Sequence, residues 1–149
     1  MKSKKAIITT SWDDGDPLDK KLSKLLLKHS IPGTFYIPIK NGNKKLLTNE
    51  NIKDLSKNFE IGGHTLNHSF LSTLSQDVAK DEIIMGKEKL EEICGEIISF
   101  AYPGGKYKVT RISKDINYLK NLNKNLILLY TGVKRTANDV AKTYINKLN

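Results

Sequence analysis

Apolar, β-branched runs alternate with helical patterns along this chain. The first apolar run covers residues 6–12, and the stretch 19–29 after it carries leucines at the three- and four-residue spacing of a helix. Pro32 and Gly33 interrupt that pattern, and a second strand-like run follows at 34–38. The sequence therefore predicts a strand, a helix and a strand at its beginning.

The same alternation continues to the end of the sequence. We expect a helix at 49–57 with Thr48 as its N-cap, and a longer helix at 76–93 with Ser75 as its N-cap. The other expected elements are strands at 59–61, 97–100 and 126–130 and helices at 112–122 and 138–148. Because this order requires crossover connections, we expect a single α/β domain over residues 1–149 with a mainly parallel sheet or barrel.

Polar residues able to do chemistry follow three of the expected strands. Asp13 and Asp14 come after the first strand, His64 and His68 after the strand at 59–61, and the stretch AYPGGKY after the strand at 97–100. In parallel α/β folds, functional residues gather at the C-terminal ends of the strands. These three clusters are therefore expected to meet at one edge of the sheet.

The two histidines lie in the stretch GGHTLNH, four residues apart. In a helical turn this spacing would direct both imidazoles to the same side. Two histidines with one carboxylate are a common ligand set for catalytic zinc, although a histidine pair in a loop can also be incidental. The third histidine, His29, ends the helix expected at 19–29, where interaction with the helix dipole explains it.

Two adjacent aspartates repel each other, so their position needs an explanation. Negative charge at a helix N-terminus accounts for Asp16 or Asp19. It accounts less well for Asp13 and Asp14, which precede Gly15 at the exit of the strand itself. A divalent cation would explain the pair, since one carboxylate could bind the metal while the other takes a proton from metal-bound water.

Composition excludes several classes of protein. With 38% hydrophobic and 28% charged residues in 149, the chain is typical of a globular domain. No apolar run reaches the roughly 20 residues of a membrane span, and the basic MKSKK start does not lead into a signal peptide, so we expect a cytoplasmic protein. The single cysteine, Cys94, excludes an internal disulfide. The net charge of +9 comes from lysines scattered over the whole chain, which does not favour nucleic-acid binding.

In combination, the motifs TSWDDGDP, GGHTLNHSFL and FAYPGGKY resemble the polysaccharide deacetylase family, the NodB-homology domain of carbohydrate esterase family 4. They are similar to the branch that has SWDDG and AYP in place of the usual TFDDGP and RxPYG. The resemblance runs from about residue 6 to residue 107, in order and with suitable spacing. It implies a distorted (β/α) barrel and the metal-dependent removal of acetyl groups from N-acetylated sugars or polysaccharide.

The resemblance also assigns roles to individual residues. Asp13 would be the general base, and Asp14, His64 and His68 would bind a divalent metal, generally Zn²⁺ with Co²⁺, Ni²⁺ or Mn²⁺ as substitutes. The third motif, with Tyr102, Pro103 and Gly104, would face the substrate, and the backbone N–H of Gly104 would stabilise the oxyanion.

Two departures from the family pattern set further expectations. The arginine of the third motif is Ala101 here, and no histidine or tryptophan follows Tyr107 to supply the later Asp-Trp and Leu-x-His motifs. The general acid would then come from elsewhere, for example Tyr102 or Tyr107. The sequence thus leaves two alternatives: an active deacetylase, or an impaired remnant or split half that binds metal or glycan. An incomplete barrel would favour a partner chain or self-association.

Overall fold

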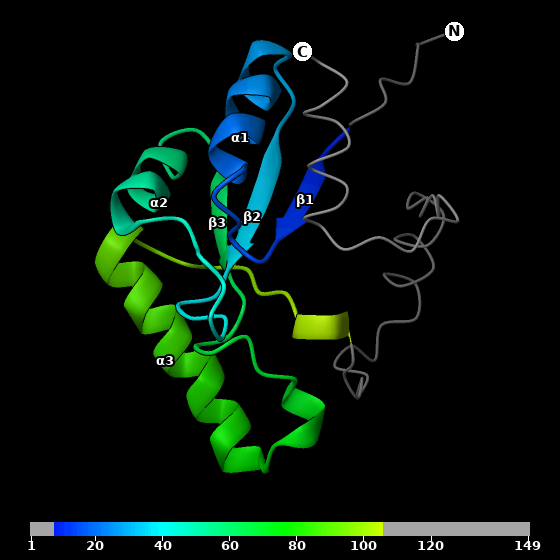
Figure 1. The fold of residues 1–149 in the computed structure, drawn as a ribbon, viewed down its shortest axis with the longest axis vertical. Coiled ribbons are helices and arrows are strands. Elements are labelled where there is room, and N and C mark those ends of the chain that lie inside the picture. Colours follow the sequence, from blue (N-terminus) through cyan, green and yellow to red (C-terminus); the bar gives the residue numbers. More distant parts are fainter. Residues whose placement is uncertain (1–7, 106–149) are drawn as a thin grey trace, which may run out of the picture.

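The computed structural model describes residues 8–105, which contain a three-stranded parallel sheet in the order β1-β2-β3. The strands are β1 (Thr10–Asp13), β2 (Gly33–Ile37) and β3 (Glu60–Gly63). Figure 1 shows that all three run in the same direction, so that their C-terminal ends meet at one edge. The predicted α/β class and the parallel arrangement are confirmed.

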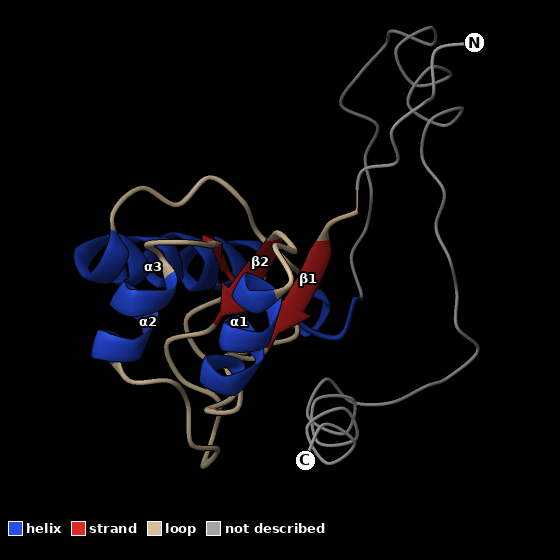
Figure 2. Cartoon of the chain, turned by 90° about the horizontal axis from the view of Figure 1, so that it is seen from above, coloured by secondary structure: helices blue, strands red, loops and turns tan. Residues whose placement is uncertain are grey.

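Three α-helices accompany these strands: α1 (Asp19–Lys28) connects β1 to β2, α2 (Asn49–Leu55) connects β2 to β3, and α3 (Gln76–Cys94) follows β3. Two short 3₁₀ helices, Leu71–Thr73 and Pro103–Gly105, complete the described elements. Figure 2 shows α2 and α3 side by side, away from β1. Thr48 caps α2 as expected, because its side chain accepts a hydrogen bond from the Asn51 backbone N–H. Ser75 occupies the N-cap position of α3, but its side chain makes no capping hydrogen bond.

The core forms where the helices meet the sheet. Phe35 and Ile37 of β2 and Leu90 of α3 are completely buried. The rings of Phe35 and Phe59 meet edge to face, with centroids 5.3 Å apart. Burying side chains of this size stabilises the fold by about 1.5–3 kcal/mol each, which fixes the sheet edge that carries the polar residues.

The strand expected at 97–100 is reduced to a single parallel bridge between Gly63 and Phe100. The reason lies in α3, whose side chains bind the backbone of this segment. Lys87 Nζ donates to the Ile97 carbonyl at 2.6 Å, and the Ile97 N–H donates to Glu91 Oε1 at 3.1 Å. These contacts use backbone groups that a longer ladder would need.

The elements expected at 112–122, 126–130 and 138–148 lie outside the described residues. Within residues 8–105, no helix is long and apolar enough to cross a membrane.

Candidate metal centre

Asp13 and Asp14 lie at the exit of β1, as predicted. Asp13 is the last residue of the strand and pairs with Tyr36 of β2. Asp14 then enters the left-handed region with φ +77°, and Gly15 follows with φ +62°. A Cβ on Gly15 would lie 2.8 Å from Ile37 Cγ2, so this turn requires glycine. The chain therefore leaves β1 through a tight turn that begins at Asp14.

His64 directly follows β3 and is almost fully buried. Its Nδ1 lies 2.9 Å from the carbonyl oxygen of Ala101, an acceptor that fixes the proton on Nδ1. The other ring nitrogen, Nε2, is therefore free to act as a ligand, and it faces Asp14 Oδ1 at 3.5 Å. A carbonyl that orients a histidine in this way is typical of the outer shell of metal sites.

His68 reaches the same carboxylate from a tight loop. Its Nε2 lies 2.9 Å from Asp14 Oδ1, and its ring centroid is 5.0 Å from that of His64. The segment between the histidines is not a helical turn, because Thr65 and His68 have φ values of +68° and +56°. The Ser69 N–H donates to Thr65 Oγ1 at 3.0 Å and closes the loop. The predicted convergence is thus achieved by a different backbone.

The donor atoms of Asp14, His64 and His68 fit a divalent cation. One ligand atom from each residue lies within 4.8 Å of the others. Tetrahedral zinc with bonds of about 2.0–2.2 Å needs ligand atoms roughly 3.3 Å apart, close to the separations from Asp14 to the two histidines. The Asp14 side chain is 29% exposed, so water can reach this carboxylate.

The electrostatics hold these residues in the forms that bind a cation. The neighbouring His64, with the charges of His68 and Lys44, lowers the pKa of Asp14 to about 2. Burial lowers the pKa of His68 below its ordinary 6.5. At neutral pH the group therefore presents an ionised carboxylate and at least one uncharged imidazole.

Asp13 is in a different environment. Burial raises the pKa of Asp13 above its ordinary 3.8, against the opposing effect of His64. The neighbouring charge of Asp14 raises it further. A carboxylate with a raised pKa beside a cation site is suited to accept a proton.

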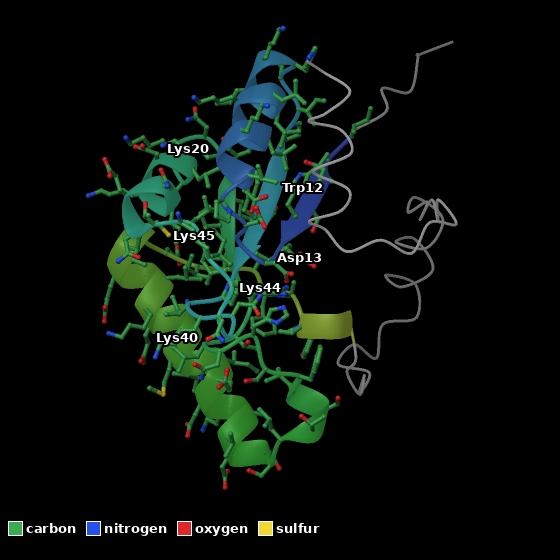
Figure 3. The ribbon with its side chains drawn as sticks, in the orientation of Figure 1. Trp12, Asp13, Lys20, Lys40, Lys44 and Lys45 are labelled. Carbon is green, nitrogen blue, oxygen red and sulfur yellow. The ribbon has the colours of Figure 1, made fainter. Side chains whose placement is uncertain are left out.

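Lys44 is a residue of this centre that sequence reasoning missed. Its Nζ lies 3.7 Å from Asp14 Oδ2, and its side chain is 65% exposed. Figure 3 labels Lys44 and Asp13 near the C-terminal ends of the strands. No motif marks Lys44 in a chain so rich in lysine, and only its place after β2 could have indicated it.

The third motif begins beside His64 and ends under an aromatic ring. Tyr102 is 41% exposed, Pro103 is buried, and Gly104 has φ +69°. A Cβ on Gly104 would overlap the ring of Phe70, whose centroid lies 6.3 Å from that of His68. Phe70 was also missed, since only its position two residues after His68 places it near the site.

The sequence is similar to those of known proteins. Residues 1–123 match the family profile described as Polysaccharide deacetylase. One peptidoglycan-N-acetylglucosamine deacetylase of Bacillus cereus is 30% identical over 117 residues, which are 75% of this chain and 54% of that protein. Another from the same organism is 28% identical over 106 residues, 66% of this chain and 36% of that protein. The chain thus spans about half or less of the length of these relatives.

Solved structures show the same fold. The Streptococcus pyogenes deacetylase PplD, in complex with acetate, gives a TM-score of 0.64 at 24% identity over 83% of this chain and 55% of that one. Bacillus subtilis PdaA, a family 4 carbohydrate esterase, gives a TM-score of 0.56 at 23% identity over 96% of this chain and 76% of that one.

Proposed function

Because this chain belongs to the polysaccharide deacetylase family, we propose that it is a metal-dependent hydrolase that removes acetyl groups from N-acetylated sugars or polysaccharide. The observation that carries the proposal is the meeting of Asp14, His64 and His68 at one edge of the sheet. The names of the two Bacillus cereus relatives support N-acetylglucosamine in a glycan chain as the substrate to test first.

The three donor residues and Asp13 each have a role in this proposal. Asp14, His64 and His68 hold the ion, with Zn²⁺ favoured and Co²⁺, Ni²⁺ or Mn²⁺ as alternatives for this donor set. When bound, the ion supplies Lewis-acid polarisation of the acetyl carbonyl and lowers the pKa of water. Asp13 accepts the proton of the attacking water, consistent with its raised pKa.

The third motif supplies the substrate-facing wall. In this proposal the backbone N–H of Gly104 donates to the developing oxyanion, and Tyr102 and Pro103 border the substrate. We further propose that residues 1–149 form one domain with the distorted (β/α) barrel of the family, of which residues 8–105 provide the three parallel strands.

The proposal is tested by measuring metal content and acetate release together. Purified protein is loaded with Zn²⁺ and incubated with N-acetylglucosamine oligomers. We expect Asp13→Asn to keep one metal per chain and to release acetate at least about 100-fold more slowly, because only the base is lost. His64→Ala should lose the metal itself. His29→Ala, an exposed histidine at the end of α1, serves as the control and should match wild type.

The outcomes separate the two functional alternatives. One bound metal with no acetate release from any oligomer would support the metal-binding remnant and reject the deacetylase. Wild-type protein without stoichiometric metal, unchanged by His64→Ala, would reject both.

A further inference from the structure

Glu82 of α3 is a buried acid whose carboxylate accepts hydrogen bonds from one residue of the loop from His64 to His68, called the histidine loop below. Its side chain is 8% exposed. Oε2 accepts a hydrogen bond from the Asn67 backbone N–H at 2.9 Å, and Oε1 accepts one from Asn67 Nδ2 at 2.6 Å. Both oxygens therefore hold the residue directly before His68.

The backbone of α3 joins the same loop. The Leu66 N–H donates to the Glu82 carbonyl at 2.8 Å, and the Leu66 carbonyl accepts from the Lys40 N–H at 2.8 Å. This approach depends on Gly86, one turn further along α3, where a Cβ would lie 2.8 Å from Leu66 N and from the Thr65 carbonyl carbon. Helix and loop therefore touch backbone to backbone.

Packing alone does not explain a carboxylate at this position. A buried carboxylate costs free energy unless it is paired, and within residues 8–105 no basic side chain lies within 4.0 Å of Glu82. An apolar side chain would leave both Asn67 donors without an acceptor, and a glutamine would accept from only one of them. The carboxylate instead supplies two acceptors to the two donors of Asn67, and such charge-assisted bonds are stronger than neutral ones.

The loop needs such a restraint because its backbone is strained. Thr65 and His68 lie in the left-handed region, which costs an L-residue about 1–2 kcal/mol. If the restraint is lost, the loop can relax, and His68 Nε2 moves away from its 2.9 Å contact with Asp14 Oδ1. Metal ligation tolerates only small displacements of a ligand.

We propose that Glu82 is a positioning residue for the metal centre, which holds His68 in ligating geometry through Asn67. The inference rests on the proposed function, since it requires that Asp14, His64 and His68 bind a metal. It assigns Glu82 no contact with metal or substrate.

The first test is the affinity of the whole chain for Co²⁺ and Zn²⁺, with the Co²⁺ absorption bands as a report on ligand geometry. In Glu82→Gln the introduced amide faces one of the two Asn67 donors, so one hydrogen bond is lost while the side-chain volume is kept. We expect affinity to fall about tenfold or more and the Co²⁺ bands to change. Glu88→Gln removes the same charge from an exposed position of α3 and should match wild type.

A donor–acceptor exchange then separates positioning from general stability. Asn67→Asp alone brings two carboxylates together, which repel each other, and it should weaken metal binding more than Glu82→Gln does. In Asn67→Asp/Glu82→Gln, the introduced amide can donate to the new carboxylate and accept from the backbone N–H of residue 67. We expect this double variant to bind metal at least tenfold more tightly than Asn67→Asp/Glu88→Gln, which has the same net charge.

Each result decides the proposal. Wild-type affinity and spectrum in Glu82→Gln would overturn it while leaving the proposed function intact. Equal affinity of the two double variants would overturn it as well, because the loss would then follow from charge or stability. A wild-type chain that binds no metal would instead overturn the proposed function, and this inference with it.

Discussion

At the scale of single residues, backbone strain is concentrated at the candidate metal centre. Four non-glycine residues among those described have positive φ, and three of them, Asp14, Thr65 and His68, belong to the two segments that carry the donor atoms. Such conformations persist only where surrounding contacts outweigh their cost. Here those contacts are the Ala101 carbonyl on His64 and the hydrogen bonds of the histidine loop. The local geometry therefore favours ligand placement over an unstrained backbone.

Asp19 provides a pH-dependent prediction at this scale. Its side chain is 4% exposed, its Oδ2 has no hydrogen-bond partner, and burial with the nearby charges of Asp16, Asp14 and Asp13 raises its pKa to about 7. A folded pKa above the ordinary 3.8 means that the folded state holds a proton that the unfolded state releases. Stability from this group is therefore complete below pH 3.8 and is lost as the pH rises through 7.

We expect Asp19→Asn, which imitates the protonated acid, to be more stable than wild type at pH 8 by up to about 4 kcal/mol. Near pH 4 the two proteins should be equally stable. The measurement is urea unfolding between pH 4 and pH 8 with a chelator present. Asp81→Asn, an exposed acid on α3, should show no such dependence, and a constant difference between wild type and Asp19→Asn at every pH would contradict the assigned pKa.

Two adjacent glycines form a matched pair for a packing prediction. Gly104 and Gly105 have φ values of +69° and +63°, so alanine strains both backbones alike. Only at Gly104 does the added Cβ meet the Phe70 ring, since nothing lies within 4 Å of a Cβ at Gly105. We expect Gly104→Ala to be about 1–3 kcal/mol less stable than Gly105→Ala in thermal unfolding. Equal losses would mean that Phe70 does not pack on Gly104.

At the scale of elements, we predict that a glycine-to-alanine substitution in α3 lowers stability, although helix propensity alone would raise it. Replacing a glycine inside a helix by alanine ordinarily stabilises it by about 1 kcal/mol. Gly86→Ala instead places a methyl group 2.8 Å from backbone atoms of Thr65 and Leu66. We expect it to destabilise the protein by about 1–3 kcal/mol in urea and to weaken Zn²⁺ binding.

The control for Gly86→Ala is Glu88→Ala on the exposed surface of the same helix, which should change neither property by much. If Gly86→Ala were stabilising, the close approach of α3 to the histidine loop would be incorrect.

Element positions were largely predictable from the sequence, whereas the geometry between elements was not. The expected helix at 76–93 becomes Gln76–Cys94, ending at Gly95 with φ +89°, because hydrophobic spacing and a C-terminal glycine are local signals. The backbone of the loop from His64 to His68 was not predicted, since no local pattern reports left-handed residues or the hydrogen bonds from Asn67 to Glu82. The prediction of a strand at 97–100 was also wrong because of contacts between elements, since side chains of α3 bind the backbone of this segment.

At the scale of the whole molecule, the donor group connects distant parts of the chain. Asp14 follows β1, while His64 and His68 follow β3, and β1 and β3 are the two outer strands of the sheet. The rule that functional residues gather at the C-terminal ends of parallel strands predicted this meeting without any knowledge of side-chain positions. The rule could not predict which residues of a lysine-rich chain would join them, and Lys44 was found only from the structure.

Because Asp14, His64 and His68, the proposed ligands, come together only in the folded chain, metal binding should stabilise the fold. A ligand that binds the native state alone, at 100 times its Kd, adds about 2.7 kcal/mol to the free energy of unfolding. We therefore expect Zn²⁺ at that concentration to raise the unfolding temperature by several degrees, and a chelator to reverse the shift. His64→Ala should abolish the shift and exposed His29→Ala should retain it. An equal shift in His64→Ala would place the bound metal elsewhere, since the remaining Asp14 and His68 offer too few ligands for comparable affinity.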